Sequence, residues 1–163
     1  MAKVLKGSEV VSAMKTRMLA EVGELKGKNI NPCLAIVRLG SRPDDKAYER
    51  GAVKRCGDLG IKCVVMEYSE SMTQDDLIRN INAVNHDPSI HGILLFRPLP
   101  KHIDENAVKY AISSEKDVDC LNPINVAKVF EGDETGFAPC TPEAVMRLLE
   151  HYRIDVSGKR TVV

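Results

Sequence analysis

Short apolar runs of strand length alternate along this sequence with longer stretches of helical periodicity. Residues 32–39, 61–68 and 91–96 are the apolar runs. The stretches with helical spacing occupy residues 10–25, 43–59, 73–85, 104–112, 124–130 and 142–152. Strands separated by single helices favour parallel pairing with right-handed crossovers. We therefore predict an α/β fold, a three-layer sandwich with a mostly parallel sheet and helices on both faces.

Residues typical of helix ends support these boundaries. Ser8, Thr73 and Thr141 are predicted N-caps, because a hydroxyl oxygen there can accept a hydrogen bond from a free N–H of the first turn. Pro43 is expected in the first turn of its helix and Pro142 at the first position of its own, where the missing N–H leaves no hydrogen bond unmade.

The last residues of the chain are typical of the start of another strand. Residues 159–163 read KRTVV and follow a glycine. A nucleotide-binding βαβ unit often opens with such a strand, and its glycine-rich turn would come next. We therefore expect residues 1–157 to form one domain and residues 158–163 to begin a nucleotide-binding domain. On this interpretation the chain is a fragment of a longer protein.

Composition and charge argue against several classes of partner. Lys plus Arg and Asp plus Glu are 23 each, so bulk charge gives no reason to expect binding to nucleic acid or to an anionic membrane. No apolar run approaches the roughly 20 residues that span a bilayer. The first residues also lack the apolar core of a secretory signal. We expect a cytoplasmic protein.

Cysteine and histidine show no spacing typical of metal ligands. The five cysteines form no CxxC pair and the four histidines form no HExxH motif. A metal site or a catalytic thiol is the functional alternative, but we expect no metal and interpret the cysteines as reduced, mostly buried thiols. They are Cys33, Cys56, Cys63, Cys120 and Cys140.

Three segments stand at the carboxyl ends of predicted strands or at the start of the element that follows. Open parallel sheets bind their ligands at that edge. The segments are 40–48 (GSRPDDKAY), 92–100 (GILLFRPLP) and 116–125 (KDVDCLNPIN), with 139–142 (PCTP) further on. We expect them to form the ligand site.

These motifs resemble those of the tetrahydrofolate dehydrogenase/cyclohydrolase family. Four matches occur in the family's order and spacing: Gly92-Ile93-Leu94, Pro98-Leu99-Pro100, Lys116-Asp117-Val118-Asp119 and Pro139-Cys140-Thr141-Pro142. The resemblance implies the amino-terminal, folate-binding catalytic domain, with tetrahydrofolate as the substrate carrier. It also implies NADP or NAD as cofactor, bound mainly by a Rossmann domain that begins near residue 158, and a homodimer for the full-length protein.

The resemblance further implies roles for individual residues. Tyr48 would stack on the pterin or aminobenzoyl part of the folate, and the Asp119 carboxylate would accept two hydrogen bonds from the pterin. Thr141 would lie near the nicotinamide. The residues expected to line the substrate site, with the two prolines as a rigid wall, are Tyr48, Leu95, Phe96, Arg97, Pro98, Leu99, Pro100, Asp119 and Thr141.

Several of these residues also have a purely structural interpretation. Tyr48 could simply pack on its own helix, and Asp119 could cap a turn or pair with Lys116. Arg97 could be a solvated charge at a strand end, instead of binding the glutamate tail of the substrate, a role that Arg55 could also take.

Two departures from the family affect the same reaction. The family's cyclohydrolase lysine, one helical turn after the tyrosine, is Ala52 here, and its partner glutamine is Phe96. Neither side chain can act as a general acid or base toward water. Lys54 is turned about 120° away from Tyr48 and is a poor substitute for the lysine. Arg55 returns to the Tyr48 face, but its guanidinium stays protonated, so it is no proton shuttle. We therefore predict NAD(P)-dependent oxidation of 5,10-methylenetetrahydrofolate to 5,10-methenyltetrahydrofolate, with hydrolysis lost.

Two other functions stay open. The protein could keep both activities, with Arg55 or Arg97 covering for the lysine, or it could be a non-catalytic folate-binding module. The sequence does not separate NAD from NADP. His91, where the family has an acidic or polar residue, receives no interpretation.

Overall fold

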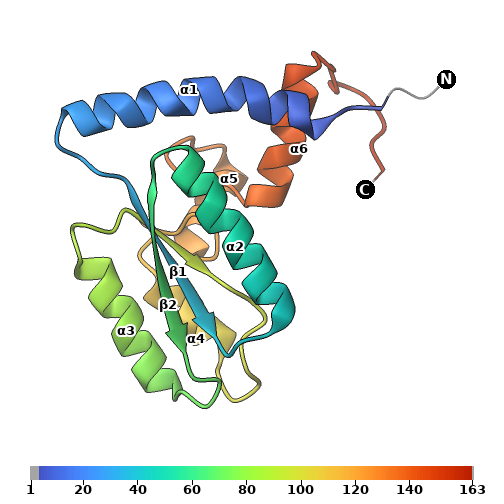
Figure 1. The fold of residues 1–163 in the computed structure, drawn as a ribbon. Coiled ribbons are helices and arrows are strands. Elements are labelled where there is room, and N and C mark those ends of the chain that lie inside the picture. The colour runs from blue at the N-terminus through green and yellow to red at the C-terminus, as the bar shows by residue number, and fades with distance from the viewer. Residues whose placement is uncertain (1–3, 163) are drawn as a thin grey trace.

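A three-stranded parallel sheet lies at the centre of the molecule, described here for residues 4–162 from a computed structural model (Figure 1). The strands are β1 (Cys33–Leu39), β2 (Lys62–Tyr68) and β3 (Gly92–Leu95), in the order β2-β1-β3. β1 pairs with β2 over its whole length, and with β3 from residue 34 to residue 37. The prediction of a parallel sheet is confirmed.

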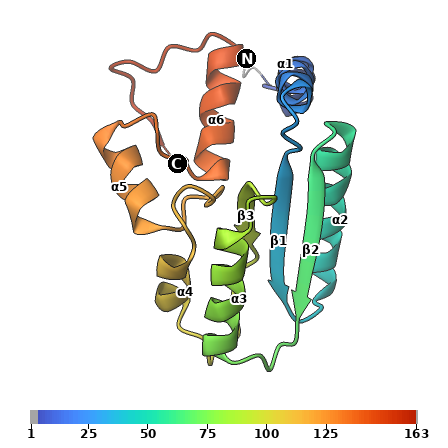
Figure 2. The ribbon, with the colours of Figure 1, turned by 90° about the vertical axis from the view of Figure 1, so that its left-hand side faces the viewer.

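Helices cover both faces of this sheet. Figure 2 shows α2 on one face and α3 and α4 on the other, while α1 crosses near the amino ends of the strands beside α6. The helices of the described residues are α1 (Gly7–Gly27), α2 (Pro43–Asp58), α3 (Gln74–His86), α4 (Glu105–Ala111), α5 (Pro123–Glu131) and α6 (Cys140–His151). The three-layer α/β prediction is confirmed.

The face toward α3 and α4 is an apolar core. Successive side chains of a strand point to opposite faces, and alternate residues of β1 from Cys33 to Leu39 belong to this core. Helix α3 supplies a matching stripe at positions i, i+4 and i+7: Leu77, Ile81 and Val84. Ile93 and Leu95 of β3 and Val108 of α4 complete the layer.

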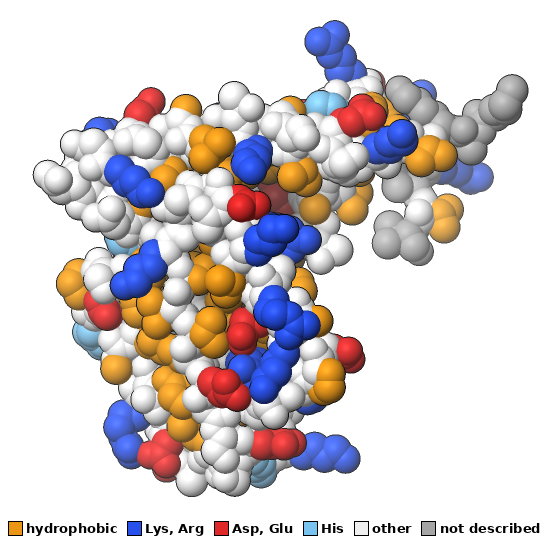
Figure 3. Space-filling view, viewed as in Figure 1, with side chains coloured by type: hydrophobic (Ala, Val, Ile, Leu, Met, Phe, Trp, Pro, Cys, Tyr) orange, Lys and Arg blue, Asp and Glu red, His pale blue; other side chains and the backbone are white. Residues whose placement is uncertain are grey.

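The face toward α2 has a different composition. None of the residues of α2 is buried. On this face the strands present a charged side chain to the helix, that of Arg38 of β1, which is 1% exposed. Figure 3 shows this side of the molecule: hydrophobic side chains gather over the strands, and acidic and basic side chains lie side by side over α2.

The predicted helix ends are correct at α3 and wrong at α1 and α6. Thr73 caps α3, accepting a hydrogen bond from the Asp76 N–H. Helix α1 begins at Gly7 and α6 at Cys140, so Ser8 and Thr141 lie inside the first turns and no side chain caps either helix. Each helix begins earlier than predicted because a carbonyl upstream accepts its first bond, Lys6 O for α1 and Pro139 O for α6.

The predicted strand over residues 159–163 is also wrong for the part that is described. Residues 159–162 form no strand, because no described strand lies alongside them to complete a hydrogen-bonded ladder. Val163 lies outside the described residues. The domain boundary at residues 157 and 158 stays a prediction.

Candidate folate site

The carboxyl ends of the strands lead into two of the predicted ligand segments. Gly40 follows β1 with a φ of 73°, a conformation that favours glycine, and its N–H donates to Tyr68 O at the end of β2. Pro43 then starts α2, as predicted. At the same edge a groove is lined by Leu39, Arg42, Glu70, Ser71, Pro98, Leu99, Pro100, Lys101 and His102.

Tyr48 and Phe96 are brought together by the fold. Tyr48 lies in the second turn of α2, and Phe96 directly follows β3, where its N–H donates to Val37 O. The two rings meet edge to face, with centroids 5.3 Å apart and planes at 63°. Phe96 is 8% exposed, whereas Tyr48 is 59% exposed. Tyr48 therefore packs on Phe96, not only on its own helix, and keeps ring surface open to a planar ligand.

Ala52 follows Tyr48 by one turn of α2 and is half-buried. Lys54 and Arg55 are exposed. The Arg55 side chain folds back along its own helix over Gly51. Its Nη1 lies 3.3 Å from the position that a Cβ on Gly51 would take. Its side chain also lines an apolar hollow against α1. No hydrogen bond between described residues links Lys54 or Arg55 to Tyr48 or Phe96.

Arg97 and the segment 98–100 have different environments. The Arg97 guanidinium pairs with Glu105 at 3.1 Å, and this hydrogen bond lowers the pKa of the Glu105 carboxyl. The Arg97 peptide oxygen accepts from Arg42 at 3.5 Å. Leu95 is buried, Pro98 is exposed, and Leu99 and Pro100 are half-buried beside the groove. Arg97 is thus an ion-paired residue at the rim.

A buried aspartate, Asp117, organises the turn that carries Asp119. Asp117 forms a parallel bridge with Ile93 and is 1% exposed. Its two carboxylate oxygens accept hydrogen bonds from the N–H groups of Leu121 at 3.0 Å and Asn122 at 2.9 Å, and from Asn125 Nδ2 at 2.9 Å. The sequence interpretation assigned Asp117 no role, although it belongs to the same KDVD segment as Asp119.

Asp119 joins this turn to the start of α6. It is half-buried, and its Oδ1 accepts from the Cys140 N–H at 3.2 Å. The Cys140 thiol donates to Val118 O at 3.3 Å, and Thr141 beside it is exposed. The suggested pairing with Lys116 does not occur, because the Lys116 ammonium donates to the carbonyls of Val84 and Asp87 instead.

The predicted site residues therefore fall into two groups. Tyr48, Phe96 and the 97–100 segment lie around the ends of α2 and β3, while Asp119 and Thr141 lie around the start of α6. No hydrogen bond or ring contact between described residues links Tyr48 to Asp119.

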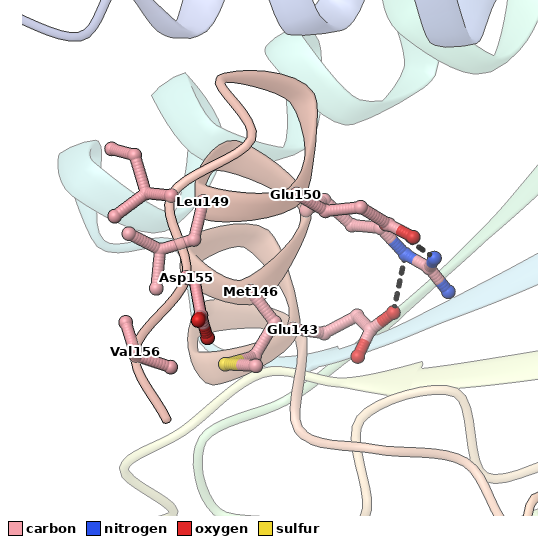
Figure 4. Close-up of a pocket in the computed structure, with 8 residues that line it drawn as sticks. Glu143, Met146, Leu149, Glu150, Asp155 and Val156 are labelled. Atoms are coloured by element: carbon pink, nitrogen blue, oxygen red, sulfur yellow. Dashed lines mark hydrogen bonds and ion pairs between the residues drawn. The ribbon is translucent and has the colours of Figure 1, made fainter. Parts of the chain in front are cut away.

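A pocket beside α6 and the segment after it contains none of the predicted site residues. Figure 4 shows Glu143, Met146, Leu149, Glu150, Asp155 and Val156 around it.

The cysteines are free thiols in varied environments. Cys33 and Cys120 are buried, Cys56 and Cys63 are half-buried, and Cys140 is exposed, so the expectation of mostly buried thiols is only partly correct. Burial, followed by a hydrogen bond with Cys56, raises the pKa of Cys63 to about 12. Desolvation of the sulfur, followed by a hydrogen bond with Asp119, raises the pKa of Cys140 to about 11 even though the residue as a whole is exposed.

The described residues offer neither a metal-binding cluster nor a membrane-spanning helix. Within residues 4–162, no group of three or more His, Cys, Asp or Glu side chains is placed to hold a metal ion. No helix in that range is both long and apolar enough to cross a membrane.

Comparison with known proteins gives matches across the chain. The family model described as the tetrahydrofolate dehydrogenase/cyclohydrolase catalytic domain matches residues 5–119. The bifunctional protein FolD of Alkaliphilus oremlandii is 53% identical over the whole chain, which spans 57% of that relative's length. The corresponding protein of Clostridium kluyveri is 50% identical, with the same coverage.

Solved structures give the same match. The bifunctional FolD of Campylobacter jejuni superposes with a TM-score of 0.92 at 41% identity, over 94% of this chain and 55% of that one. The Trypanosoma brucei dehydrogenase-cyclohydrolase, solved with NADP cofactor and inhibitor, gives a TM-score of 0.90 at 33% identity, over 98% and 55%. The chain therefore belongs to the tetrahydrofolate dehydrogenase/cyclohydrolase family.

Proposed function

We propose that the full-length protein oxidises 5,10-methylenetetrahydrofolate to 5,10-methenyltetrahydrofolate with NAD or NADP, and that it has lost the cyclohydrolase step. The observation that carries the second part is the pair Ala52 and Phe96, which stand where the family resemblance expects a lysine and a glutamine. The same proposal includes a cytoplasmic location and a homodimer.

Hydride transfer requires mainly that the folate be held in position against the nicotinamide. The open ring of Tyr48 suits one planar part of the folate, and the Asp119 carboxylate suits the adjacent N–H donors of a pterin. Among the described residues, Thr141 is the one proposed to approach the nicotinamide. The rest of the cofactor site is proposed to lie in the part of the relatives' length that this chain does not span.

Hydrolysis of the methenyl product makes different demands. A water must be deprotonated and a leaving nitrogen protonated, steps to which a general acid–base contributes typically about 10²–10⁴-fold. Ala52 has no ionisable group, and Phe96 is nearly buried against Tyr48. Arg55 stays protonated, and Arg97 is paired with Glu105. The environments of these four residues favour loss of the cyclohydrolase step.

A bifunctional enzyme is the second candidate. The observation that favours it is the similarity to relatives named bifunctional protein FolD, at 53% and 50% identity. On this reading an arginine, Arg55 or Arg97, supports hydrolysis.

The test is to assay both reactions of the full-length protein, following nicotinamide reduction and methenyl consumption separately. The proposal expects reduction without enzymatic hydrolysis, and expects Ala52→Lys combined with Phe96→Gln to raise hydrolysis by up to about 10²-fold. Ala47→Lys, at an exposed position of the same helix, is the matched control. Fast hydrolysis by the unaltered protein would overturn the loss and support the bifunctional reading. Folate binding without either reaction would support a non-catalytic module.

A further inference from the structure

Helix α2 carries Tyr48 and Ala52, although it has little apolar attachment to the sheet. None of its residues is buried, whereas a helix on a sheet is ordinarily held by an apolar stripe. Its N-cap residue, Arg42, makes no side-chain capping bond either. Apolar burial on this face of β1 is centred on Ile36, which is 0% exposed, so a directional contact can add to what defines the position of this helix.

Arg38 provides a directional attachment. It is the penultimate residue of β1 and is 1% exposed. Its Nε donates to Glu49 Oε2 of α2 at 2.8 Å, and its Nη2 lies 2.9 Å from Glu67 Oε2 of β2. Its Nη1 also donates to the carbonyl of Gly40, in the turn that leads into α2. One guanidinium thus joins a helix, a neighbouring strand and the connecting turn.

We propose that Arg38 is a positioning residue for the folate: through Glu49 it fixes the turn of α2 that presents Tyr48 to the substrate. Glu49 is the next residue after Tyr48, so any rotation of this turn moves the Tyr48 ring relative to Phe96. The inference rests on the proposed function, because it assigns Tyr48 to the folate.

The chemistry of arginine suits this task. The guanidinium is planar and carries five N–H donors in a fixed fork, so it can serve three acceptors in different directions at once. A lysine offers a single charged point and cannot hold the same three groups in one plane. Hydrogen bonding with Glu67 raises the pKa of Arg38, so the cation persists across the working pH range. Arg38 is buried and only 17% of the Glu49 side chain is exposed, so removal of the Glu49 carboxylate weakens a pairing that water replaces poorly.

The experiment uses the full-length protein and measures KM and kcat for methylenetetrahydrofolate oxidation together with the Kd for tetrahydrofolate. The key variant is Glu49→Gln, which keeps the shape of the side chain and removes its charge. We expect it to raise KM and Kd by roughly 2- to 10-fold, the value of one aromatic stacking contact, with a smaller change in kcat. Glu21→Gln is the matched control, because Glu21 pairs with Arg17 on the exposed side of α1.

A double-mutant cycle separates positioning from a general loss of stability. If Arg38 acts through Tyr48, Glu49→Gln should change Kd much less in a Tyr48→Ala background than alone. Arg38→Met should follow the same pattern, and Arg38→Lys should recover only part of the affinity. Thermal unfolding of each variant shows which of them fail to fold. If the Arg38 variants do not fold, the milder Glu49→Gln variant still tests the inference.

The outcomes distinguish this inference from the proposed function. An unchanged Kd in Glu49→Gln, or equal changes with and without Tyr48, overturns the role of Arg38 even if oxidation proceeds. If the unaltered protein binds tetrahydrofolate but transfers no hydride, the proposed function fails, and the same cycle of Kd values still decides the inference. Absence of folate binding overturns both.

Discussion

Helices α2 and α3 follow neighbouring strands of one sheet, yet they are attached to it by different chemistry. α3 inserts Leu77, Ile81 and Val84 into an apolar core that continues into β3 and α4. α2 buries no residue, and its contacts with the sheet include the ion pair of Arg38 with Glu49. Apolar burial is strong and non-directional, whereas a guanidinium–carboxylate contact fixes an orientation.

This difference separates stability from positioning. The α3 face contributes burial of apolar surface, which is the main favourable term in folding. The α2 face carries Tyr48 and the position of the family lysine, where the direction of a side chain matters more than the buried area. We therefore expect mutations on the α3 face to act mainly on stability and mutations on the α2 face to act mainly on the site.

The largest expected effect tests the α3 face. Leu77→Ala removes a side chain with 0% exposure and should lower the free energy of unfolding by about 2–5 kcal/mol, because a cavity remains. Val53→Ala on α2, where Val53 is 38% exposed, should cost less than about 1 kcal/mol. Urea unfolding of both variants measures the two values. Similar losses would remove the distinction between the faces.

The next effect concerns a second buried polar residue, Asp117, which differs from Arg38 in that no ion pair links it to another described residue. Asp117→Asn replaces one of the two acceptor oxygens with an NH₂ group, which then faces either the N–H of Leu121 or the N–H of Asn122, and should destabilise by about 2–3 kcal/mol. Asp133→Asn is the control, because Asp133 is exposed and accepts only from its local turn. Calorimetric melting compares the two variants. An equal loss of stability would mean that the buried hydrogen bonds of Asp117 contribute no more than the exposed ones of Asp133.

Local signals made the α3 side of this comparison predictable from the sequence. The cap at Thr73 and the span of α3 depend on residues close in sequence, so the pattern alone identified them. The motif KDVD identified the segment that contains Asp119, but the contact of Asp119 with the start of α6 and the role of Asp117 needed the fold: the partners of Asp117 converge only when the turn closes around the carboxylate.

The attachment of α2 to the sheet could not be predicted from the sequence. Arg38 occurs in an apolar run, CLAIVRL, where a single charge reads as an interruption. Its partners are 11 and 29 positions away, and only the parallel register and the path of α2 bring them together. Ala52 and Phe96 were visible as departures from a family pattern. That Phe96 packs against Tyr48 followed from the structure alone.

A smaller effect tests how α3 begins. The Thr73 hydroxyl accepts from the Asp76 N–H at 3.2 Å, while α2 begins without such a cap. Thr73→Ala should therefore cost about 1 kcal/mol of folding free energy. Thr16→Ala, at an exposed position within α1, should be neutral or slightly stabilising because alanine is the better helix former. Denaturant midpoints compare the two, and an undiminished midpoint in Thr73→Ala would refute the role of the cap.

The smallest effect is a pH dependence on the α2 face. Hydrogen bonding with Arg38 lowers the pKa of Glu67 from its ordinary value of 4.5. A carboxyl with a lowered folded-state pKa stabilises the fold above its unfolded pKa, and this contribution is lost as pH falls through the folded value. Unfolding free energies at about pH 6 and about pH 3 should therefore differ less in Glu67→Gln than in the unaltered chain. The change should be modest, because the Glu67 side chain is 53% exposed and solvent screens its charge. Glu21→Gln should leave the pH dependence as it is, and an identical acid response in Glu67→Gln would mean that the Arg38 attachment does not depend on this carboxylate.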